Sequence, residues 1–305
     1  MVAALLPLTS GPAAAATATA RAIDDGCPTD RVPSAGFNDT RGSFFEAAID
    51  CVAWYGITSG DNSGGFSPGQ TVNRAQMAAF LVNLIEATGK QLDPNPPDAF
   101  SDDNGTFFET KINQLANLGV VSGSPDVNDE DGDGNTSERL YRPAARVSRA
   151  QMASFLNSAH TAVTGVAISS ADDFFTDDDG TFHEDNINAI ASVGIGTGTS
   201  STTFNPSGSV GRAAMAAFLV REIDYLVELG FLSPPVTDNA DVVLDSLKVN
   251  QGRQVIGRIF TEKDARVSAA TVDICNGANG TDISMNEANF AFSFTLPFEA
   301  EIGNC

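Results

Sequence analysis

Three arginines of this chain precede the same short motif, at positions where a positive side chain can bind an anion. Arg74, Arg149 and Arg212 are each followed, three residues later, by Met-Ala-x-Phe-Leu, which is typical of a helix. The first turn of a helix has free backbone N–H groups and a positive dipole, so it attracts anions. A guanidinium beside these groups can bind a carboxylate through two hydrogen bonds. We therefore predict that these arginines contact an anionic ligand.

A second candidate site is an acidic stretch near the middle of the chain. Asp129, Asp131 and Asp133 alternate with other residues and are followed by Gly134. This spacing directs three carboxylates at one hard cation, and the glycine allows the turn. Leu140 stands where a complete EF-hand has its bidentate glutamate. The loop is therefore not an EF-hand.

Other oxygen donors lie close enough in sequence to complete a cation site. They are Asp126, Asn128, Asn135 and Glu138. We predict Ca²⁺ as the ligand, and the alternative is a solvated acidic loop without a metal. The runs at 102–105 and 177–180, DDNG and DDDG, are interpreted as turn and cap sequence rather than metal sites.

These candidate residues belong to a repeat that occurs three times. The segments FNDTRGSFFEAAIDCVAWYGITSG, FSDDNGTFFETKINQLANLGVVSG and FTDDDGTFHEDNINAIASVGIGTG begin at Phe37, Phe100 and Phe175. In each copy a glycine follows the first phenylalanine by 19 residues, and later come an aromatic, a proline and the arginine. The second copy differs by a 12-residue insertion that holds the acidic stretch. Such agreement indicates one structural unit used three times.

Each copy is predicted to form a helix, a loop and a second helix. Apolar residues spaced three and four apart predict first helices over about 44–55, 107–118 and 182–193. A glycine ends each of them. The second helices begin at the arginines, with Asn73 and Ser148 as caps, whereas Gly211 supplies no side-chain cap.

The ordered motifs resemble the S-layer homology (SLH) family. They are F-x-D, G-I-T-x-G in residues 56–60, F-x-P and the Arg-Ala box, and together they cover about residues 37–229. The resemblance implies a mainly α fold in which three helix-loop-helix repeats form a pseudo-threefold bundle, with the second helices central. It also implies non-covalent anchoring of an exported protein to anionic, often pyruvylated, bacterial cell-wall polysaccharide. Arg212 is the weakest candidate contact, because Gly211 and Ala214 depart from the family's box.

The resemblance and the residues together give a predicted polymer-binding set. It consists of Arg74, Arg149, Arg212, Asp39, Asp102, Asp177, Trp54 and Gly56. Two alternatives remain open. Each arginine would instead pair with an F-x-D aspartate as a structural tie, and Trp54 with Tyr55 would form a buried helix face rather than a platform for sugar stacking. His183 occupies the place of a phenylalanine in the other copies, so we interpret it as a packing residue.

The composition excludes several classes of function. With 17 basic and 39 acidic residues, the net charge is −22, which opposes binding to nucleic acid or to an anionic lipid surface. Two histidines and four cysteines are too few for a multi-zinc protein. We find no nucleophile with an adjacent base, no zinc motif and no phosphate loop in the sequence. We therefore predict a protein that is not an enzyme.

The ends of the chain indicate export. Residues 1–22 resemble the remainder of a secretory signal, with A-x-A cleavage options between Ala13 and Ala22, and no segment is long enough to span a membrane. Of the three possible disulfide pairings, the simplest is Cys27–Cys51 with Cys275–Cys305. Residues 236–305 alternate Val, Ile and Phe with turn residues, which predicts a small β-sandwich-like domain.

The predicted organisation therefore has six parts. They are a signal remnant (1–22), an N-terminal segment (23–36), repeats at 37–90, 99–165 and 173–230, and the β domain (236–305). The predicted function is a secreted, cell-wall or S-layer associated anchor. Two alternatives are a calcium-dependent surface assembly or adhesion protein and an anchored secreted hydrolase. The sequence does not determine the oligomeric state.

Overall fold

The computed structural model describes most of the repeat region and parts of the C-terminal region. The described residues are 17–61, 63–128 and 138–235, together with the strands at 242–244, 254–259, 284–286 and 291–295. The fold is mainly α-helical, as predicted. The helices are α1 (Glu46–Trp54), α2 (Arg74–Ala87), α3 (Glu109–Asn117), α4 (Arg149–Thr164), α5 (Glu184–Ser192) and α6 (Arg212–Glu228), with a 3₁₀ turn, η1 (Ser101–Asp103).

The second helix of each repeat begins where the sequence predicts. Asn73 and Ser148 accept hydrogen bonds from the backbone of Gln76 and Gln151, whose side chains bond back to the cap residue, so both capping boxes form. Gly211, the corresponding residue in the third repeat, makes no side-chain cap. The three first helices begin two residues later than predicted, at Glu46, Glu109 and Glu184.

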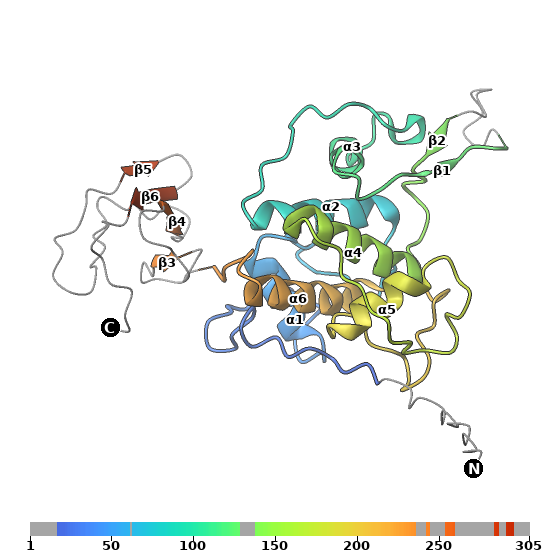
Figure 1. Cartoon of the computed structure of the whole chain (residues 1–305), viewed down its shortest axis with the longest axis horizontal. Helices are drawn as coiled ribbons and strands as arrows, with labels where there is room; N and C mark the ends of the chain where they lie inside the picture. The colour runs from blue at the N-terminus through green and yellow to red at the C-terminus, as the bar shows by residue number, and fades with distance from the viewer. Residues whose placement is uncertain are drawn as a thin grey trace, which may run out of the picture.

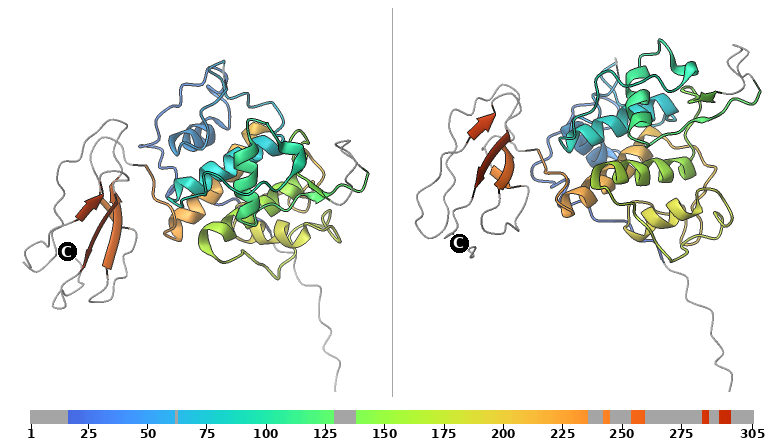
Figure 2. Two further views of the ribbon diagram at one scale, coloured as in Figure 1. Left: turned by 90° about the horizontal axis from the view of Figure 1, so that it is seen from above. Right: turned by 45° about the horizontal axis from the view of Figure 1, so that its top comes forward.

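The helices pack between repeats rather than within them. The pairs in extensive contact include α2 with α3, α4 with α5 and α6 with α1, so each second helix receives the first helix of the next repeat. Helix α4 also contacts both α2 and α6. Figure 1 shows α2, α4 and α6 next to one another in the middle of the helical region, and Figure 2 shows the same helices from two other directions.

Three buried valines close this arrangement into a ring. The backbone N–H of Val72 donates to the carbonyl of Val210 at 2.9 Å, Val210 donates to Val147 at 2.9 Å, and Val147 donates to Val72 at 3.0 Å. All three side chains are buried. Each valine stands two residues before the arginine of its repeat. The backbone ring therefore fixes the starts of the three second helices relative to one another.

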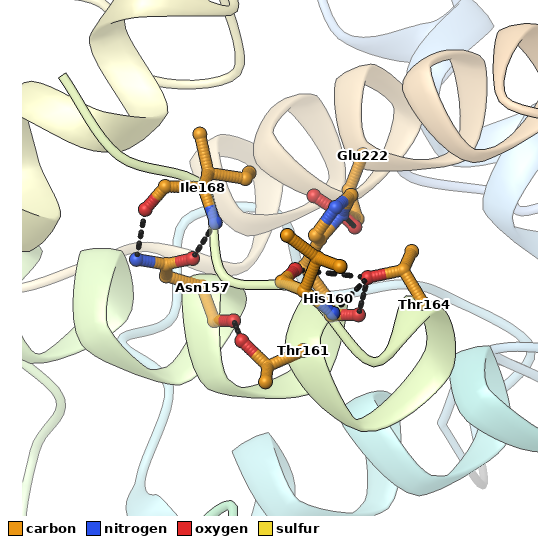
Figure 3. Close-up of polar contacts among 7 residues, drawn as sticks. Asn157, His160, Thr161, Thr164, Ile168 and Glu222 are labelled. Atoms are coloured by element: carbon orange, nitrogen blue, oxygen red, sulfur yellow. Dashed lines mark hydrogen bonds and ion pairs between the residues drawn. The ribbon is translucent and has the colours of Figure 1, made fainter.

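A buried polar pair joins α4 to α6. His160 Nδ1 lies 2.9 Å from Glu222 Oε1, and both side chains are almost fully buried (Figure 3). The imidazole also stacks on Tyr225, with ring centroids 5.2 Å apart. Asn157, one turn earlier on α4, exchanges two hydrogen bonds with the backbone of Ile168. These contacts fix α4 against α6 and against the chain that follows it.

The N-terminal segment packs onto the third repeat. The backbone N–H of Arg21 donates to the carbonyl of Gly194 at 2.9 Å, and its guanidinium pairs with Asp224 at 2.7 Å. A cleavage after Ala22 would remove Arg21 and these contacts. The signal remnant at residues 1–22 stays a prediction, and Arg21 lies within it.

A disulfide attaches the same segment to the first repeat. Cys27 and Cys51 are bonded, with Cα atoms 5.8 Å apart, which confirms this half of the predicted pairing. Tyr55 is buried and donates from its hydroxyl to the carbonyl of Gly26 at 2.7 Å. Residues 21–27 thus connect α1 to α6.

The strands belong to two separate sheets. Strands β1 (Ser124–Pro125) and β2 (Arg139–Leu140) pair antiparallel at the base of the acidic insertion. Strands β3 (Val242–Leu244), β4 (Gln254–Ile259), β5 (Ser284–Asn286) and β6 (Ala291–Thr295) form an antiparallel sheet in the order β3-β4-β6-β5. The predicted sandwich and the Cys275–Cys305 pair otherwise lie outside the described residues.

Candidate functional site

The three repeat arginines make the same contacts with the next repeat in the ring. The Nε atoms of Arg74, Arg149 and Arg212 donate to the backbone carbonyls of Tyr141, Phe204 and Phe66, each at 2.6 Å. Each guanidinium also lies 4.4 to 4.6 Å from the ring centroid of that same aromatic residue. The Nε atom of each arginine therefore has a structural role, because it joins its repeat to the next one.

The F-x-D aspartates bind the same aromatic residues from the other side. The carboxylate of Asp39 accepts the backbone N–H groups of Phe66 and Ser67, at 2.8 and 2.7 Å. Asp102 and Asp177 make equivalent pairs of bonds in their own repeats. In the described part of the chain, no ion pair joins a repeat arginine to these aspartates. The predicted structural tie therefore passes through the aromatic residue between them.

One groove collects residues from all three repeats. It has a volume of about 720 Å³. Residues 56–61 and α2 of the first repeat form one side, α3 of the second repeat forms the other, and Arg212 of the third repeat contributes at the ring. Gly56 of the predicted binding set lines this groove, whereas Arg74, Arg149 and Trp54 are not among its lining residues.

Arg212 is a buried cation in this groove. Only 7% of the residue is exposed, and its Nε atom is the one bonded to the Phe66 carbonyl. Among the described residues, no carboxylate lies within ion-pair distance of it. Burial lowers the pKa of Arg212, and the more distant charges of Asp61 and Asp39 oppose this shift. A buried cation without a counter-ion is costly, so an anion in the groove would stabilise it.

Lys111 brings a second positive charge to the groove. Its Nζ atom donates to Asn83 Oδ1 at 2.7 Å, and Asn83 Nδ2 donates in turn to the carbonyl of Ile57 at 2.9 Å. Asp61 is the acidic residue of the lining, and hydrogen bonds from Ser63, Ser67 and Gly65 occupy its carboxylate and lower its pKa. Two basic residues and one acidic residue thus line the groove, and Glu86 Oε2 lies 3.9 Å from Lys111 Nζ at its edge, in a chain of net charge −22.

Phe107 supplies an exposed aromatic ring at the edge of the groove. It is 93% exposed and meets Phe108 edge to face, with centroids 5.1 Å apart. Phe44 and Phe182 hold the same place in the other repeats and are also more than 90% exposed. Lys111 and these phenylalanines are not among the binding residues predicted from the sequence. The repeated aromatic pair before each first helix was the available signal.

The corresponding positions of the other repeats differ. Ala48 and Asn186 stand where the second repeat has Lys111. Asn186 on α5 bonds to Asn157 on α4. Gly194, the equivalent of Gly56, is covered by the N-terminal segment, because a Cβ there would lie 2.7 Å from the Arg21 nitrogen. The combination of Lys111 and Arg212 in one groove is therefore specific to the junction between the first and second repeats.

Trp54 and Tyr55 both pack at the end of α1. Tyr55 is buried, and Trp54 is half-buried and meets it edge to face, with centroids 5.5 Å apart. These contacts favour the packing interpretation over a platform for sugar stacking. His183 lies before α5 with its ring 2.8 Å from the Ser154 hydroxyl. It packs at the position that phenylalanine holds in the other repeats.

The predicted calcium loop lies largely outside the described residues. These undescribed residues are 129–137, and they include Asp129, Asp131, Asp133 and Asn135. At its base, Asp126 is fully buried, and its backbone N–H donates to the carbonyl of Glu138 at 3.0 Å. The calcium assignment to this loop stays a prediction.

Comparison with known proteins identifies the first two repeats. The model of the S-layer homology domain matches residues 36–78 and 99–153. The chain is 24% identical over 174 residues to an S-layer protein of Bacillus thuringiensis subsp. finitimus, covering 57% of this chain and 19% of that protein. It is 26% identical over 181 residues to an S-layer protein of Bacillus licheniformis, covering 58% of this chain and 18% of that one.

A relative of another class shares part of the chain. An uncharacterized cell wall amidase of Bacillus anthracis is 28% identical over 120 residues, which is 39% of this chain and 20% of the amidase. The chain thus spans about a fifth of the length of these relatives. No helix of the described residues is long and apolar enough to cross a membrane. The matches indicate a secreted protein associated with the cell wall or S-layer, and they show that the chain contains S-layer homology domains in its first two repeats.

Proposed function

We propose that the three repeats form one pseudo-threefold unit that anchors the protein to an acidic bacterial cell-wall polysaccharide. The polymer binds in the groove between the first and second repeats. The third repeat takes part because its arginine enters that groove. The equivalent contacts of Arg74, Arg149 and Arg212 support the count of three repeats.

The observation that carries this proposal is the unpaired buried charge of Arg212. A carboxylate on a sugar would accept hydrogen bonds from the guanidinium and from Lys111 at the same time. The exposed ring of Phe107 offers an apolar face for a sugar ring at the groove's edge. A volume of about 720 Å³ holds a small number of sugar units rather than a folded partner.

The net charge of the chain makes this binding local. At −22, the protein repels an anionic polymer at long range, so attraction begins only when the polymer reaches the groove. Association should therefore be slow at low salt and should not depend on unspecific contacts. This behaviour distinguishes a specific anchor from a sticky basic surface.

We further propose that the chain is not catalytic. Ser67 and Asp61 form a hydroxyl–carboxylate pair in the lining, at 2.6 Å. Further hydrogen bonds from Ser63 and Gly65 occupy the Asp61 carboxylate and lower its pKa, which makes it a poor general base. The match to the amidase covers 20% of that protein, so the shared segment need not carry its named activity. Incubation of the chain with purified cell walls should release no soluble sugar or peptide.

The test is retention on purified bacterial cell walls. Lys111→Gln removes one groove charge at a partly exposed position and should weaken retention about tenfold. Lys90→Gln is the matched control, because Lys90 is exposed, bonds to the carbonyl of Ala162 and is not among the residues that line the groove. Walls treated with mild acid, which removes pyruvyl groups, should retain less of the wild-type protein.

Two results would contradict the proposal. One is equal retention of the Lys111→Gln and Lys90→Gln variants, which would place binding elsewhere. The other is equal retention of the wild type by native and acid-treated walls, which would exclude the pyruvyl carboxylate as the recognised group.

A further inference from the structure

A fully buried carboxylate without a partner precedes the first helix of the third repeat. Asp178 is 0% exposed, and neither of its side-chain oxygens has a hydrogen-bond partner among the described residues. Leaving a carboxylate in this state costs several kcal/mol, so native proteins pair it or coordinate it to a metal. Burial raises the pKa of Asp178, and the neighbouring charges of Asp173, Glu184 and Asp177 raise it further.

Two other carboxylates converge on this group. Ligand oxygens of Asp173, Asp178 and Asp179 all lie within 4.8 Å of one another. Asp173 and Asp179 are exposed while Asp178 is buried, so the cluster opens to solvent on one side. A cation can therefore enter from solvent and reach the buried oxygens.

The second repeat contains the same buried group. Asp103 is 0% exposed, and both its carboxylate oxygens lack hydrogen-bond partners among the described residues. Asp98, the equivalent of Asp173, is the strongest neighbouring charge that raises its pKa. Asn104 stands at the position of Asp179 and offers a neutral oxygen. The pattern thus recurs in two independent copies.

The first repeat shows what replaces the cluster. At the three corresponding positions it has Ala35, Thr40 and Arg41. Thr40 is buried and its hydroxyl contacts the carbonyl of Phe37, so the buried position is satisfied without charge. Arg41 places a positive side chain where the third repeat has Asp179. All three changes remove cation ligands together, which is expected if the residues form one site.

We propose that two of the three repeats bind Ca²⁺ through these loops. The site in the third repeat uses Asp173, Asp178 and Asp179, and its counterpart in the second uses Asp98, Asp103 and Asn104. Oxygen-only ligands in an irregular arrangement suit Ca²⁺, whereas Mg²⁺ needs a near-ideal octahedron. With few protein ligands and two of them exposed, the dissociation constant should lie at about 10⁻⁴ to 10⁻³ M.

These sites differ from the acidic insertion and from the groove. Asp103, Asn104, Asp178 and Asp179 belong to the DDNG and DDDG runs, which were interpreted as turn and cap sequence, whereas Asp98 and Asp173 precede the F-x-D motif. None of the six residues lines the groove. Calcium binding here and wall binding there can therefore succeed or fail independently.

The experiment is calcium titration calorimetry of the full chain after treatment with a chelator. The wild type should bind Ca²⁺, and Asp178→Asn and Asp103→Asn should each remove one site or weaken it at least tenfold. Asp185→Asn is the matched control, because Asp185 is an exposed residue of α5 outside the cluster. Asp131→Ala removes a predicted ligand of the acidic insertion, so any binding heat lost in this variant comes from the insertion and not from the two proposed sites.

Two further measurements distinguish loss of calcium binding from loss of the fold. Asp173 is exposed, so Asp173→Asn should leave the fold intact and still weaken binding at the third-repeat site. Calcium should raise the unfolding temperature of the wild type more than that of Asp178→Asn. The proposal is overturned if Asp178→Asn, Asp103→Asn and Asp173→Asn bind calcium with the wild-type stoichiometry and affinity.

Discussion

The Nε atom of Arg212 donates to the backbone carbonyl of Phe66 at 2.6 Å, and the guanidinium lies 4.6 Å from the centroid of the same ring. These residues are 146 positions apart in the sequence. The contact joins the third repeat to the first and closes the ring that the other two arginines continue. The same arginine lines the groove, so structure and proposed binding depend on one side chain.

Arg212→Ala should destabilise the fold substantially. The variant leaves the buried carbonyl of Phe66 without this donor and removes a desolvated contact between a cation and an aromatic ring, at a combined cost of about 3 kcal/mol. Denaturant unfolding measures the change in the free energy of unfolding. The control, Arg41→Ala, alters an exposed residue and should change it by less than about 0.5 kcal/mol. Equal stability of the two variants would contradict a role in ring closure.

Glu222 should make stability depend on pH in the acidic range. Burial raises the pKa of Glu222 above its ordinary value of 4.5, and the hydrogen bond from His160 and the charges of His160 and Arg21 oppose the shift. The folded state then binds a proton more tightly than the unfolded chain. The free energy of unfolding should therefore fall as pH rises from about 4.5 to the raised pKa.

Glu222→Gln tests this dependence. A neutral amide keeps a hydrogen-bonding group beside His160, so the variant should lose this part of the pH dependence and should be no less stable than the wild type at pH 7 (Figure 3). Glu222→Ala leaves the imidazole without its partner and should cost about 1–3 kcal/mol. Identical pH profiles of wild type and Glu222→Gln would show that Glu222 is not the titrating group.

The disulfide between Cys27 and Cys51 should contribute strongly to stability. It closes a loop with a sequence separation of 24 residues, for which chain entropy gives about 3 kcal/mol. The Cys27→Ala, Cys51→Ala double variant should unfold at a correspondingly lower denaturant concentration. A Cys275→Ala, Cys305→Ala double variant serves as comparison and should leave the unfolding of the helical repeats unchanged. A mass spectrum of unreduced peptides checks both pairings.

Two glycines of the first repeat should respond differently to alanine. Gly60 has φ +82°, and an added Cβ would lie 2.3 Å from Phe37 Cε1 and 2.5 Å from the Gly65 carbonyl. Gly56 has φ +70°, with no atom within 4 Å of an added Cβ. Gly56→Ala should cost only the strain of the left-handed backbone, about 1 kcal/mol, and Gly60→Ala at least twice that amount. Similar unfolding midpoints for the two variants would contradict this steric difference.

Local rules of the sequence determined the helices and their ends. The apolar spacing located α1 to α6, the caps at Asn73 and Ser148 formed as expected, and Gly211 made no side-chain cap. Gly56, Gly119 and Gly194 adopt positive φ after the first helices, as predicted for helix ends. The proximity of Cys27 and Cys51 in sequence was enough to select their pairing. These features depend on residues only a few positions apart, or on one short loop.

Only the tertiary structure decided how the repeats differ in their surroundings. The sequence ranked Arg212 as the weakest ligand contact, yet Arg212 lines the groove with Lys111, because the two come from different repeats and meet only when the ring closes. The F-x-D motif is present in every copy, so the sequence does not distinguish the residues that follow it. In the structure Asp103 and Asp178 are buried, whereas Asn104 and Asp179 beside them are exposed. A repeat pattern describes each unit by itself, whereas burial and charge pairing depend on which unit packs against it.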